Sequence, residues 1–283
     1  MPRILIAGCG YVGAATADLF HAAGWEIEGW THSPPSGRAD YLVRAVDLTN
    51  EEAVRQAGGR FDAVIQAASS RGGDAPAYRK IYLQAARNLS AVFPDSLLLF
   101  TSSTSVYAQT NGEWVNESSP ANPERETGRI LRETEETVLG GGGVVTRLAG
   151  VYGPGRSALL TRFLAGDAQI DASGDRFLNQ IHRDDIASAL LLLVRHHLHK
   201  KEGVQIYNVA DHNPITQRDA YVWLATRLQR PIPSTAAAAT ERKRGNSNKR
   251  VSSEKLQALG WAPRYSTFEI AMAESILPAA GLA

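Results

Sequence analysis

Short apolar runs alternate with segments of helical periodicity through the first half of the chain. The apolar runs, each of strand length, cover residues 4–7, 25–31, 42–46, 63–68, 97–101 and 144–148. Helical periodicity is carried by residues 11–23, 51–57, 75–92 and 123–139. Strands that are apolar throughout are typical of parallel sheets covered on both faces. The pattern therefore predicts an α/β fold, with a Rossmann-type doubly wound parallel sheet and right-handed crossovers.

The alternation of strands and helices ends after residue 150, where residues typical of turns become frequent. Residues 185–196 and 217–228 predict two more helices, 204–209 predict a strand, and 231–248 predict a mobile loop. We expect a Rossmann domain over 1–151. Residues 152–283 are expected to form mostly a smaller C-terminal lobe, with segments near 180–210 returning to the Rossmann sheet.

Charge, the length of apolar runs and cysteine content argue against several classes of protein. The 283 residues include 30 Lys and Arg against 29 Asp and Glu, so no global field attracts nucleic acid or an anionic membrane. The longest apolar run, 186–194, is too short to span a bilayer, and 4–7 is too short for the core of a signal peptide. The single cysteine excludes an internal disulfide. We expect a cytoplasmic protein that acts on a small molecule, with no nucleic-acid or membrane partner and with a homodimer left open.

A glycine motif follows the first predicted strand. Gly8, Gly10 and Gly13 form G-x-G-x-x-G, in which the first glycine allows a tight turn, the second a close approach of pyrophosphate, and the third close helix–strand packing. The amides of Tyr11 and Val12 open the helix and would face the phosphates. The alternative is a strand–helix turn that merely favours glycine. The position of the motif, at the first strand of an alternating chain, favours a dinucleotide site.

The end of the second strand bears on the choice of dinucleotide. Specificity for NAD usually places an acid there, to bond the ribose hydroxyls. This chain instead has Thr31, His32 and Ser33, with Arg38 following. Since no carboxylate would repel a 2′-phosphate, we expect NADP(H) to be preferred over NAD(H).

Cys9 lies between two of the glycines at the positive end of the predicted helix. That position lowers the pKa of a thiol, so Cys9 is a candidate reactive residue beside the phosphates. The alternative is a small side chain that simply fits the turn.

Ordered motifs along nearly the whole chain resemble those of the short-chain dehydrogenase/reductase superfamily, in its extended, NAD-dependent epimerase/dehydratase form. They lie at 8–13, 45–48, 66–69, 102–107, 147–155, 181–186, 206–209 and 255–265. The resemblance implies a substrate-binding C-terminal lobe. It also implies that Asp47, with Leu48 after it, bonds the adenine amino group, although Asp47 is also a suitable strand-end cap.

The same resemblance assigns a further segment to the cofactor. It implies that the segment formed by Gln66, Ala67, Ala68 and Ser69 passes over the pyrophosphate and the nicotinamide ribose. Small residues at a buried strand end are also consistent with packing alone.

The chain departs from that family where its catalytic pair should be. The glycine turn is one residue shorter than the usual G-x-x-G-x-x-G. Thr127 and Leu131 fall at the positions of the family's Tyr-x-x-x-Lys, and Tyr82 falls where an active-site asparagine is common. Ser103 is retained. The pattern is similar to an atypical bacterial subgroup of NAD(P)-binding epimerases or oxidoreductases.

Ser103 and Tyr107 are the candidate catalytic residues. Ser103 ends a parallel strand at the carboxyl edge, where ligands collect, and its hydroxyl would donate to a substrate oxygen. Tyr107 would be the proton donor, and Tyr152 would flank the same cleft and contact substrate. The alternatives are hydroxyls that satisfy local backbone groups and tyrosines that only pack.

Arginines supply the candidate contacts to an anionic substrate. Arg129 and Arg132 lie on one stripe of the helix after Pro123, where they either hold such a group or form solvated ion pairs with glutamates four positions on. Arg147 fits an internal ion pair as readily as a ligand contact. No metal is expected, because the pair His182 and Asp185 has no third ligand nearby in sequence. The basic segment 242–250 either covers a diphosphate or is a solvated loop.

Two functions follow. The first is an NAD(P)-dependent oxidoreductase or epimerase acting on a hydroxyl/carbonyl of a small, sugar-like molecule. The second is a catalytically weak or inactive NADP(H)-binding sensor or regulatory protein, which the missing Tyr and Lys favour.

Overall fold

A computed structural model describes residues 1–283 except 34–38, 71, 173–175, 201–204, 237–246 and 283. The chain separates into two compact units. The first unit comprises 1–106, 121–148 and 186–207, and the second comprises 107–120, 149–185 and 208–283. The expected boundary at 151 lies close to the observed one at 148, whereas 107–120, assigned to the Rossmann domain by sequence, belongs to the second unit.

The first unit is built on a seven-stranded sheet of order β12-β7-β5-β4-β1-β2-β3. The strands are β1 (Arg3–Ala7), β2 (Glu26–Thr31), β3 (Leu42–Ala45), β4 (Ala63–Gln66), β5 (Leu97–Ser103), β7 (Val144–Leu148) and β12 (Gln205–Val209). Strand order reverses between β1 and β4, which is where doubly wound sheets bind ligands. Every residue of β4 and β7 is buried, as expected for a parallel sheet covered on both faces. The predicted Rossmann-type fold is confirmed.

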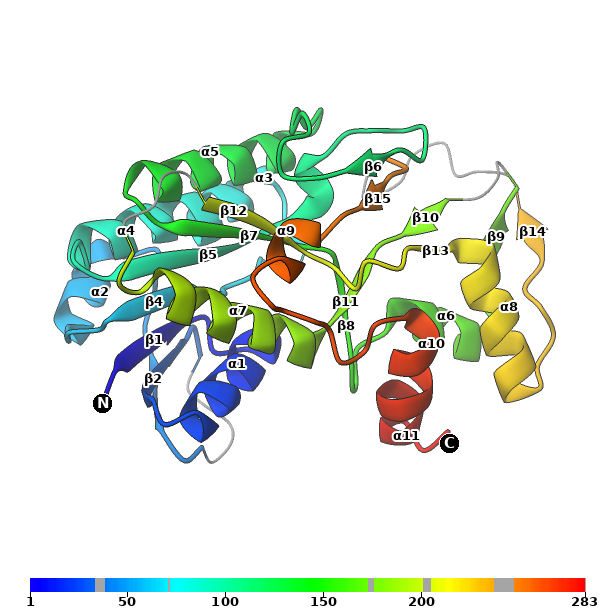
Figure 1. Ribbon diagram of the computed structural model, residues 1–283, viewed down its shortest axis with the longest axis horizontal. Helices are drawn as coiled ribbons and strands as arrows, with labels where there is room; N and C mark the ends of the chain where they lie inside the picture. The colour runs from blue at the N-terminus through cyan, green and yellow to red at the C-terminus, as the bar shows by residue number, and fades with distance from the viewer. Residues whose placement is uncertain (34–38, 71, 173–175, 201–204, 237–246, 283) are drawn as a thin grey trace. The chain divides into compact units, whose positions relative to one another are not determined.

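Helices cover both faces of this sheet (Figure 1). Helices α1 (Tyr11–Ala22) and α7 (Arg183–His197) lie on one face, and α2 (Glu51–Ala57), α4 (Ala85–Val92) and α5 (Glu126–Gly140) lie on the other. The predicted helix 75–92 is continuous but contains a π-helical turn, η1 (Arg79–Gln84), between α3 (Ala75–Tyr78) and α4. The turn is stabilised by Gln66, whose Nε2 donates to the carbonyls of Ile81 and Tyr82 at 3.3 and 2.9 Å.

Helix α5 begins later than the sequence predicts. Arg125 is its N-cap, and the helix starts at Glu126 rather than at residue 123. Pro123 packs against the first turn from outside, because a Cβ on Gly128 would lie 2.5 Å from the Cβ of Pro123. The proline therefore shapes the approach to the helix rather than its first position.

The second unit contains short paired strands that the sequence analysis did not predict. They are β6 (Trp114–Val115) with β15 (Arg250–Val251), β8 (Gly150–Tyr152) with β11 (Gln180–His182), β9 (Ile170–Asp171) with β14 (Thr235–Ala236), and β10 (Phe177–Leu178) with β13 (Ile215–Thr216). Strands of two or three residues carry too little periodicity to be recognised. Strand β14 lies inside the predicted loop 231–248, most of which lies outside the described residues.

Helices complete the second unit around a core of its own. They are α6 (Ala158–Ala165), α8 (Gln217–Leu228), α9 (Glu254–Gln257), α10 (Phe268–Ala271), the π turn η3 (Met272–Ile276) and α11 (Leu277–Ala279). Leu160 and Phe163 of α6, Leu224 of α8 and Phe268 of α10 are buried together. Each segment alone is too short to bury an apolar face, so this unit depends on contacts between distant parts of the chain.

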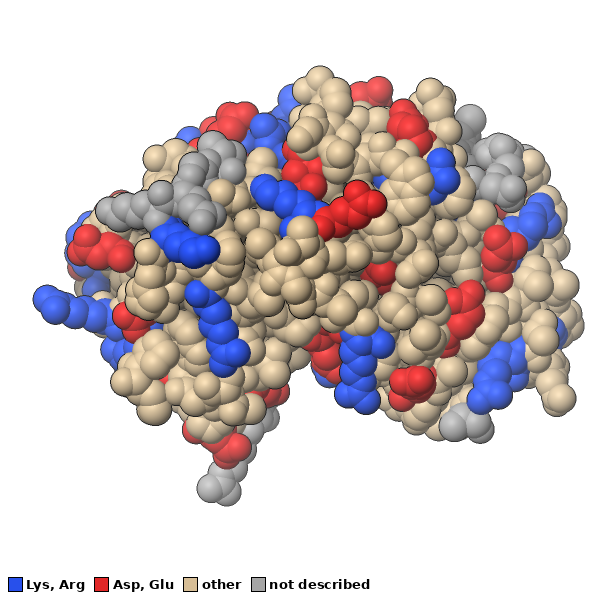
Figure 2. Space-filling view, viewed as in Figure 1, with Lys and Arg blue, Asp and Glu red and all other residues tan. Residues whose placement is uncertain are grey.

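Charged side chains are dispersed over the surface. In the view of Figure 2, basic and acidic residues are interspersed and neither sign dominates. No described helix is both long and apolar enough to cross a membrane.

Candidate dinucleotide site and catalytic residues

The glycine turn joins β1 to α1 and is fixed to the end of β2. The amides of Gly8 and Cys9 both donate to the carbonyl of Trp30, at 3.0 and 2.7 Å, and Gly10 donates to Gly8. Gly8 has a φ of 106°, and a Cβ there would lie 2.2 Å from the backbone nitrogen of Ala68. The first glycine is therefore required by both conformation and space.

The other two glycines differ in what surrounds them. A Cβ on Gly13 would lie 2.1 Å from the carbonyl oxygen of Gly8, so the third glycine permits close helix–strand packing. A Cβ on Gly10 would meet nothing within 4 Å. Gly10 is the N-cap of α1, whose first-turn amides lack partners inside the helix. Gly10 therefore leaves open space, and the amides of Tyr11 and Val12 follow it at the N-terminus of the helix. This combination fits a pyrophosphate.

The end of β2 offers exposed polar groups. His32 and Ser33 are exposed, whereas the hydroxyl of Thr31 donates to the carbonyl of Ser33 at 2.5 Å. His32 and Lys80 both lie near enough to Asp47 to lower the pKa of its carboxyl group. Arg38 lies outside the described residues. The described residues at the end of β2, Thr31 to Ser33, thus carry no carboxylate, although Asp47 lies close to His32.

Of the two alternatives for Cys9, the structure favours the small side chain that fits the turn. Burial raises the pKa of the Cys9 thiol to about 11, and a hydrogen bond with Tyr41 only partly opposes the increase. The sulfur packs beside Gly29 of β2, where a Cβ would lie 2.9 Å from it. Tyr41 in turn donates to Asp18 at 2.8 Å. Cys9 is therefore a small packing residue of the turn, because desolvation outweighs the field of the helix.

Asp47 and Leu48 end the segment after β3. Partial burial alone would raise the pKa of Asp47, but hydrogen bonds from the amide and hydroxyl of Thr49, at 2.9 and 2.8 Å, bring it below its usual value. Asp47 is exposed and caps this turn. Both hydrogen bonds from Thr49 are accepted by its Oδ1, so they also orient the other carboxylate oxygen. The carbonyl of Leu48 accepts from the buried amide of Asn88 at 2.8 Å, which fixes the backbone here.

The segment after β4 lies against the glycine turn through its backbone. Ala67 and Ala68 provide the atoms that a Cβ on Gly8 would meet. The side chain of Gln66 is fully buried and holds the π turn, so only its backbone is left for a dinucleotide. Ser69 is exposed at the strand end. Small residues here serve close packing, which is compatible with a cofactor passing over them.

The hydroxyl side chains at the end of β5 have different roles. Two donate to other parts of the fold, and one keeps its hydrogen available for a ligand. Thr101 donates to the carbonyl of Gln66 at 3.0 Å, and Ser102 donates to Glu135 at 2.6 Å. The Oγ of Ser103 accepts from the amide of Ser105 at 3.1 Å, while its own hydrogen has no acceptor among the described residues. The Ser103 oxygen is thus held by a local hydrogen bond, while its hydroxyl hydrogen is available to donate to a ligand.

Tyr82 is a phenol that the sequence analysis did not consider as a proton donor. It lies on the π turn with its ring 6.1 Å from that of Phe100, in the strand that ends at Ser103. Its oxygen accepts from the amide of Ser70 at 3.3 Å, and its hydrogen has no acceptor within the described parts of the chain. The only sequence signal was its occurrence at the family's asparagine position.

Thr127 and Leu131, which were expected from sequence at the positions of the family's Tyr and Lys, both lie on α5. Leu131 is buried at 3% exposure, and Thr127 is an aliphatic alcohol. Arg132 is paired with the buried Glu135 and, at 3.4 Å, with Glu136, which favours the ion-pair alternative for this residue.

Arg129 is exposed, and its Nη1 donates to the carbonyl of Glu124 at 2.7 Å. The expected pair between Arg129 and Glu133 is not formed. Glu133 instead pairs with Arg79 and Arg87, at 3.4 and 3.0 Å. Of the two arginines proposed as substrate contacts, Arg129 is thus the one without a carboxylate partner among the described residues.

Two tyrosines proposed for the cleft belong to the second unit and are buried. Tyr107, at 1% exposure, donates from its hydroxyl to Oδ1 of Asn208 at 2.9 Å. This arrangement favours the packing alternative for Tyr107 over its proposed role as acid. Tyr152 is also buried, burial raises the pKa of its phenol, and its oxygen has no hydrogen-bond partner among the described residues.

Comparison with known proteins identifies a family. The sequence model described as the NAD dependent epimerase/dehydratase family matches residues 4–210. Protein YeeZ of Escherichia coli strain K12 is 33% identical over 228 residues, covering 74% of this chain and 77% of YeeZ.

Solved structures share the fold over nearly the whole chain. One from Methylobacillus flagellatus, described by the same family name, has a TM-score of 0.82 at 26% identity and covers 99% of both chains. UDP-glucose 4-epimerase from Bifidobacterium longum, in complex with NAD⁺ and UDP, has a TM-score of 0.78 at 16% identity and covers 96% of both chains. At that identity, the second likeness concerns the fold alone.

Proposed function

Because this chain belongs to the NAD dependent epimerase/dehydratase family, we propose that it is an NADP(H)-dependent oxidoreductase or epimerase acting on a hydroxyl/carbonyl of a small, sugar-like molecule. The observation that carries the proposal is the glycine turn. Gly8 and Gly13 are required by packing, but Gly10 faces open space at the start of a helix. A structural turn has no need of a glycine there, whereas a pyrophosphate does.

The preference for NADP(H) is supported by the edge beside β2. The exposed imidazole of His32 and the hydroxyl of Ser33 suit a 2′-phosphate, and the nearby Lys80 adds positive charge. A ribose that carries only hydroxyls would gain nothing from that charge.

For catalysis, we assign the substrate oxygen to Ser103. When bound, the nicotinamide supplies hydride transfer. The Ser103 hydroxyl, which has a free hydrogen and an oxygen held by Ser105, donates to the carbonyl or hydroxyl oxygen of the substrate. Tyr82 supplies the phenol that moves the proton, since its hydrogen is uncommitted and Thr127 is too weak an acid.

Calorimetric titration with NADPH and NADH, followed by single-turnover oxidation of bound NADPH against ketoses and nucleotide-keto-sugars, tests the proposal. We expect NADPH to bind more tightly and at least one carbonyl compound to be reduced. Equal or reversed affinities would contradict the cofactor assignment. Failure to bind either dinucleotide would contradict the proposed function.

A second candidate function is a dinucleotide sensor without turnover. It is favoured by α5, where Leu131 is buried and uncharged at the position of the family's lysine. Tight dinucleotide binding with no oxidation by any compound of the panel is the result that would support the sensor over the enzyme.

A further inference from the structure

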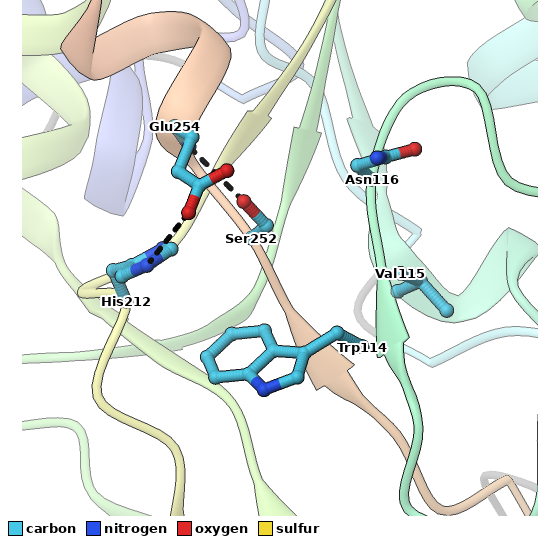
Figure 3. Close-up of a pocket in the computed structure, with 6 residues that line it drawn as sticks. All are labelled: Trp114, Val115, Asn116, His212, Ser252 and Glu254. Atoms are coloured by element: carbon cyan, nitrogen blue, oxygen red, sulfur yellow. Dashed lines mark hydrogen bonds and ion pairs between the residues drawn. The ribbon is translucent and has the colours of Figure 1, made fainter.

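The hollow shown in Figure 3 lies within the second unit and has a volume of about 340 Å³. It is lined by Trp114, Val115, Asn116, His212, Ser252 and Glu254. The indole of Trp114 is stacked with the imidazole of His212 at 5.2 Å, and the guanidinium of Arg250 lies 5.3 Å from the same indole. Contacts within the protein therefore account for this aromatic side chain, and no ligand is needed to explain it.

A buried amide in the first unit is not explained in the same way. The side chain of Gln66, at the end of β4, is fully buried. Its Nε2 donates to two successive carbonyls, but its Oε1 has no hydrogen-bond partner among the described residues. A buried acceptor without a partner destabilises the folded protein, whereas an apolar side chain of similar shape avoids that penalty. Glutamine at this position thus serves to donate, not only to fill space.

The two carbonyls that accept from Gln66 lie where the π turn η1 returns to α-helix. They belong to Ile81 and Tyr82, at 3.3 and 2.9 Å. Just after the turn, the amide of Ala85 donates to the carbonyl of Lys80, five residues earlier instead of the usual four. A side chain inserted at such a break can supply donors in place of the backbone. Turns of this kind occur mostly singly inside α-helices and often at functional sites.

Both ends of the helix that contains the π turn are fixed. At its start, Asp74 caps α3 and accepts from the amide of Ala77 at 3.0 Å. Near its end, Asn88 donates to the carbonyl of Leu48 at 2.8 Å. The extra residue of the π turn is therefore kept between two anchors. Without the donors of Gln66 the turn could move along the helix, and each residue that it passes would rotate by about 100° around the helix axis.

Tyr82 is held from the sheet on several sides. Its carbonyl accepts from Gln66, its ring lies 6.1 Å from that of Phe100, and its hydroxyl oxygen accepts from the amide of Ser70 at 3.3 Å. Gln66 and Phe100 are paired in register between β4 and β5, so their side chains extend from the same face of the sheet. Two neighbouring strands thus fix the backbone and the ring of Tyr82, and the segment after β4 fixes its oxygen.

We propose that the Gln66 side chain is a positioning residue for catalysis, which holds the π turn in place and thereby fixes the Tyr82 hydroxyl that moves the proton. This role rests on the function proposed above, and it adds that Gln66 acts only through Tyr82. Gln66 transfers no proton itself, since its Nε2 is directed to two backbone carbonyls.

NMR of the full chain, with tyrosine labelled by ¹³C at Cζ, tests where the phenol lies. The Tyr82 resonance is identified by its absence in Tyr82→Phe. Gln66→Met removes the amide donors from a side chain of similar length, and we expect the Tyr82 resonance to shift or split. An unchanged Tyr82 resonance in Gln66→Met would overturn the proposal.

Gln84→Met is the matched control for this measurement. Gln84 belongs to the same π turn but is exposed, and its Nε2 donates to the side chain of Asn88 at 2.8 Å instead of to the backbone of the turn. The Tyr82 resonance should not change in this variant. An equal change in both variants would mean that the bonds from Gln66 have no particular role in placing Tyr82.

Single-turnover oxidation of bound NADPH measures the catalytic consequence. Gln66→Met should slow it at least about tenfold, because a small displacement of a catalytic group is sufficient for such a loss. Combined with Tyr82→Phe, the same substitution should slow it no further than Tyr82→Phe alone, since the two residues act as one unit. Additive losses would show that Gln66 acts independently of Tyr82 and would overturn the proposal.

Thermal unfolding shows whether each variant folds. If Gln66→Met does not, Gln66→Asn takes its place, because it keeps an amide but is too short to reach both carbonyls, and the same shift and rate loss are expected. If the wild type reduces no compound of the panel, the proposed function fails, and the catalytic role of Gln66 fails with it. An unaffected rate in Gln66→Met, with an active wild type, overturns the role of Gln66 alone.

Discussion

The guanidinium of Arg147, on β7, lies 2.7 Å from the carboxylate of Glu135, on α5, inside the first unit. The two side chains are 2% and 0% exposed, and Ser102 donates to the same carboxylate. The sequence was compatible with either an internal ion pair or a ligand contact for Arg147. In the structure Arg147 forms the ion pair. The pair ties α5, which carries Thr127 and Leu131, to the sheet whose strand β5 ends at Ser103.

Breaking this pair should destabilise the protein strongly. Glu135→Gln leaves a buried guanidinium without its counter-ion, and we expect a loss of about 3–5 kcal/mol in the free energy of unfolding. The measurement is urea denaturation. The control is Glu51→Gln, which breaks the exposed pair of Glu51 with Arg55 and should cost less than about 1 kcal/mol. Equal effects of the two substitutions would mean that the buried pair carries no special weight.

Gly10→Ala should separate binding from folding. The added methyl meets no protein atom within 4 Å, so thermal stability should be retained. The methyl would occupy the space assigned to pyrophosphate, and dinucleotide affinity should fall at least about tenfold. Calorimetry and thermal unfolding measure the two effects. Gly140→Ala, also in open space, is the control. Unchanged affinity of Gly10→Ala would place the phosphates elsewhere.

A carboxylate at the end of β2 should reverse the cofactor preference. His32→Asp places a negative charge where we assign the 2′-phosphate, so NADPH should bind at least about tenfold more weakly while NADH is retained. The measurement is titration of both dinucleotides at constant ionic strength. His199→Asp makes the same change in charge at an exposed position in the turn after α7 and should leave the ratio unchanged. An unaltered ratio in His32→Asp would refute the assignment.

Three variants distinguish the catalytic candidates. Ser103→Ala and Tyr82→Phe should each slow single-turnover NADPH oxidation by about 10²-fold or more, since both remove a donor from the reacting oxygen. Tyr107→Phe should leave that rate nearly unchanged and instead reduce the free energy of unfolding by about 1–2 kcal/mol, because it removes a buried hydrogen bond to Asn208. A large rate loss in Tyr107→Phe alone would restore the assignment made from sequence.

Lys249 should make the pH dependence of stability distinctive. It is buried, donates to the carbonyl of Tyr107 at 3.0 Å and has no carboxylate partner among the described residues. Burial, aided by the charge of Arg176, lowers its pKa from 10.5 to about 8. Between these values the unfolded amine holds a proton that the folded one has lost.

Unfolding therefore takes up a proton in that range, and the free energy of unfolding should gain from Lys249 as pH rises from about 8 toward 10.5. Denaturation at pH 7 and near pH 10 measures the gain relative to Lys249→Met, in which it should be absent. The exposed Lys80→Met is the control. A parallel change in the wild type and Lys249→Met would contradict the lowered pKa.

Local pattern was sufficient for most of the first unit. Strand and helix periodicity is carried by consecutive residues, so β1 to β7 of the sheet and the helix 51–57 could be predicted closely, as could the helix 217–228 of the second unit. The roles of Gly8 and Gly13 also followed from the motif. The π turn did not, because it depends on Gln66, more than a dozen positions away.

The sequence by itself thus determined the parallel sheet and the glycine turn that follows its first strand. Only the tertiary structure decided which polar groups have hydrogen-bond partners in the protein and which do not. Tyr107 is bonded to a residue 101 positions away, and Ser102 to one 33 positions away, while the hydrogens of Ser103 and Tyr82 have no acceptor among the described residues. The physical reason is that periodicity is a local property of the chain, whereas desolvation and hydrogen-bond partners come from segments that folding brings together.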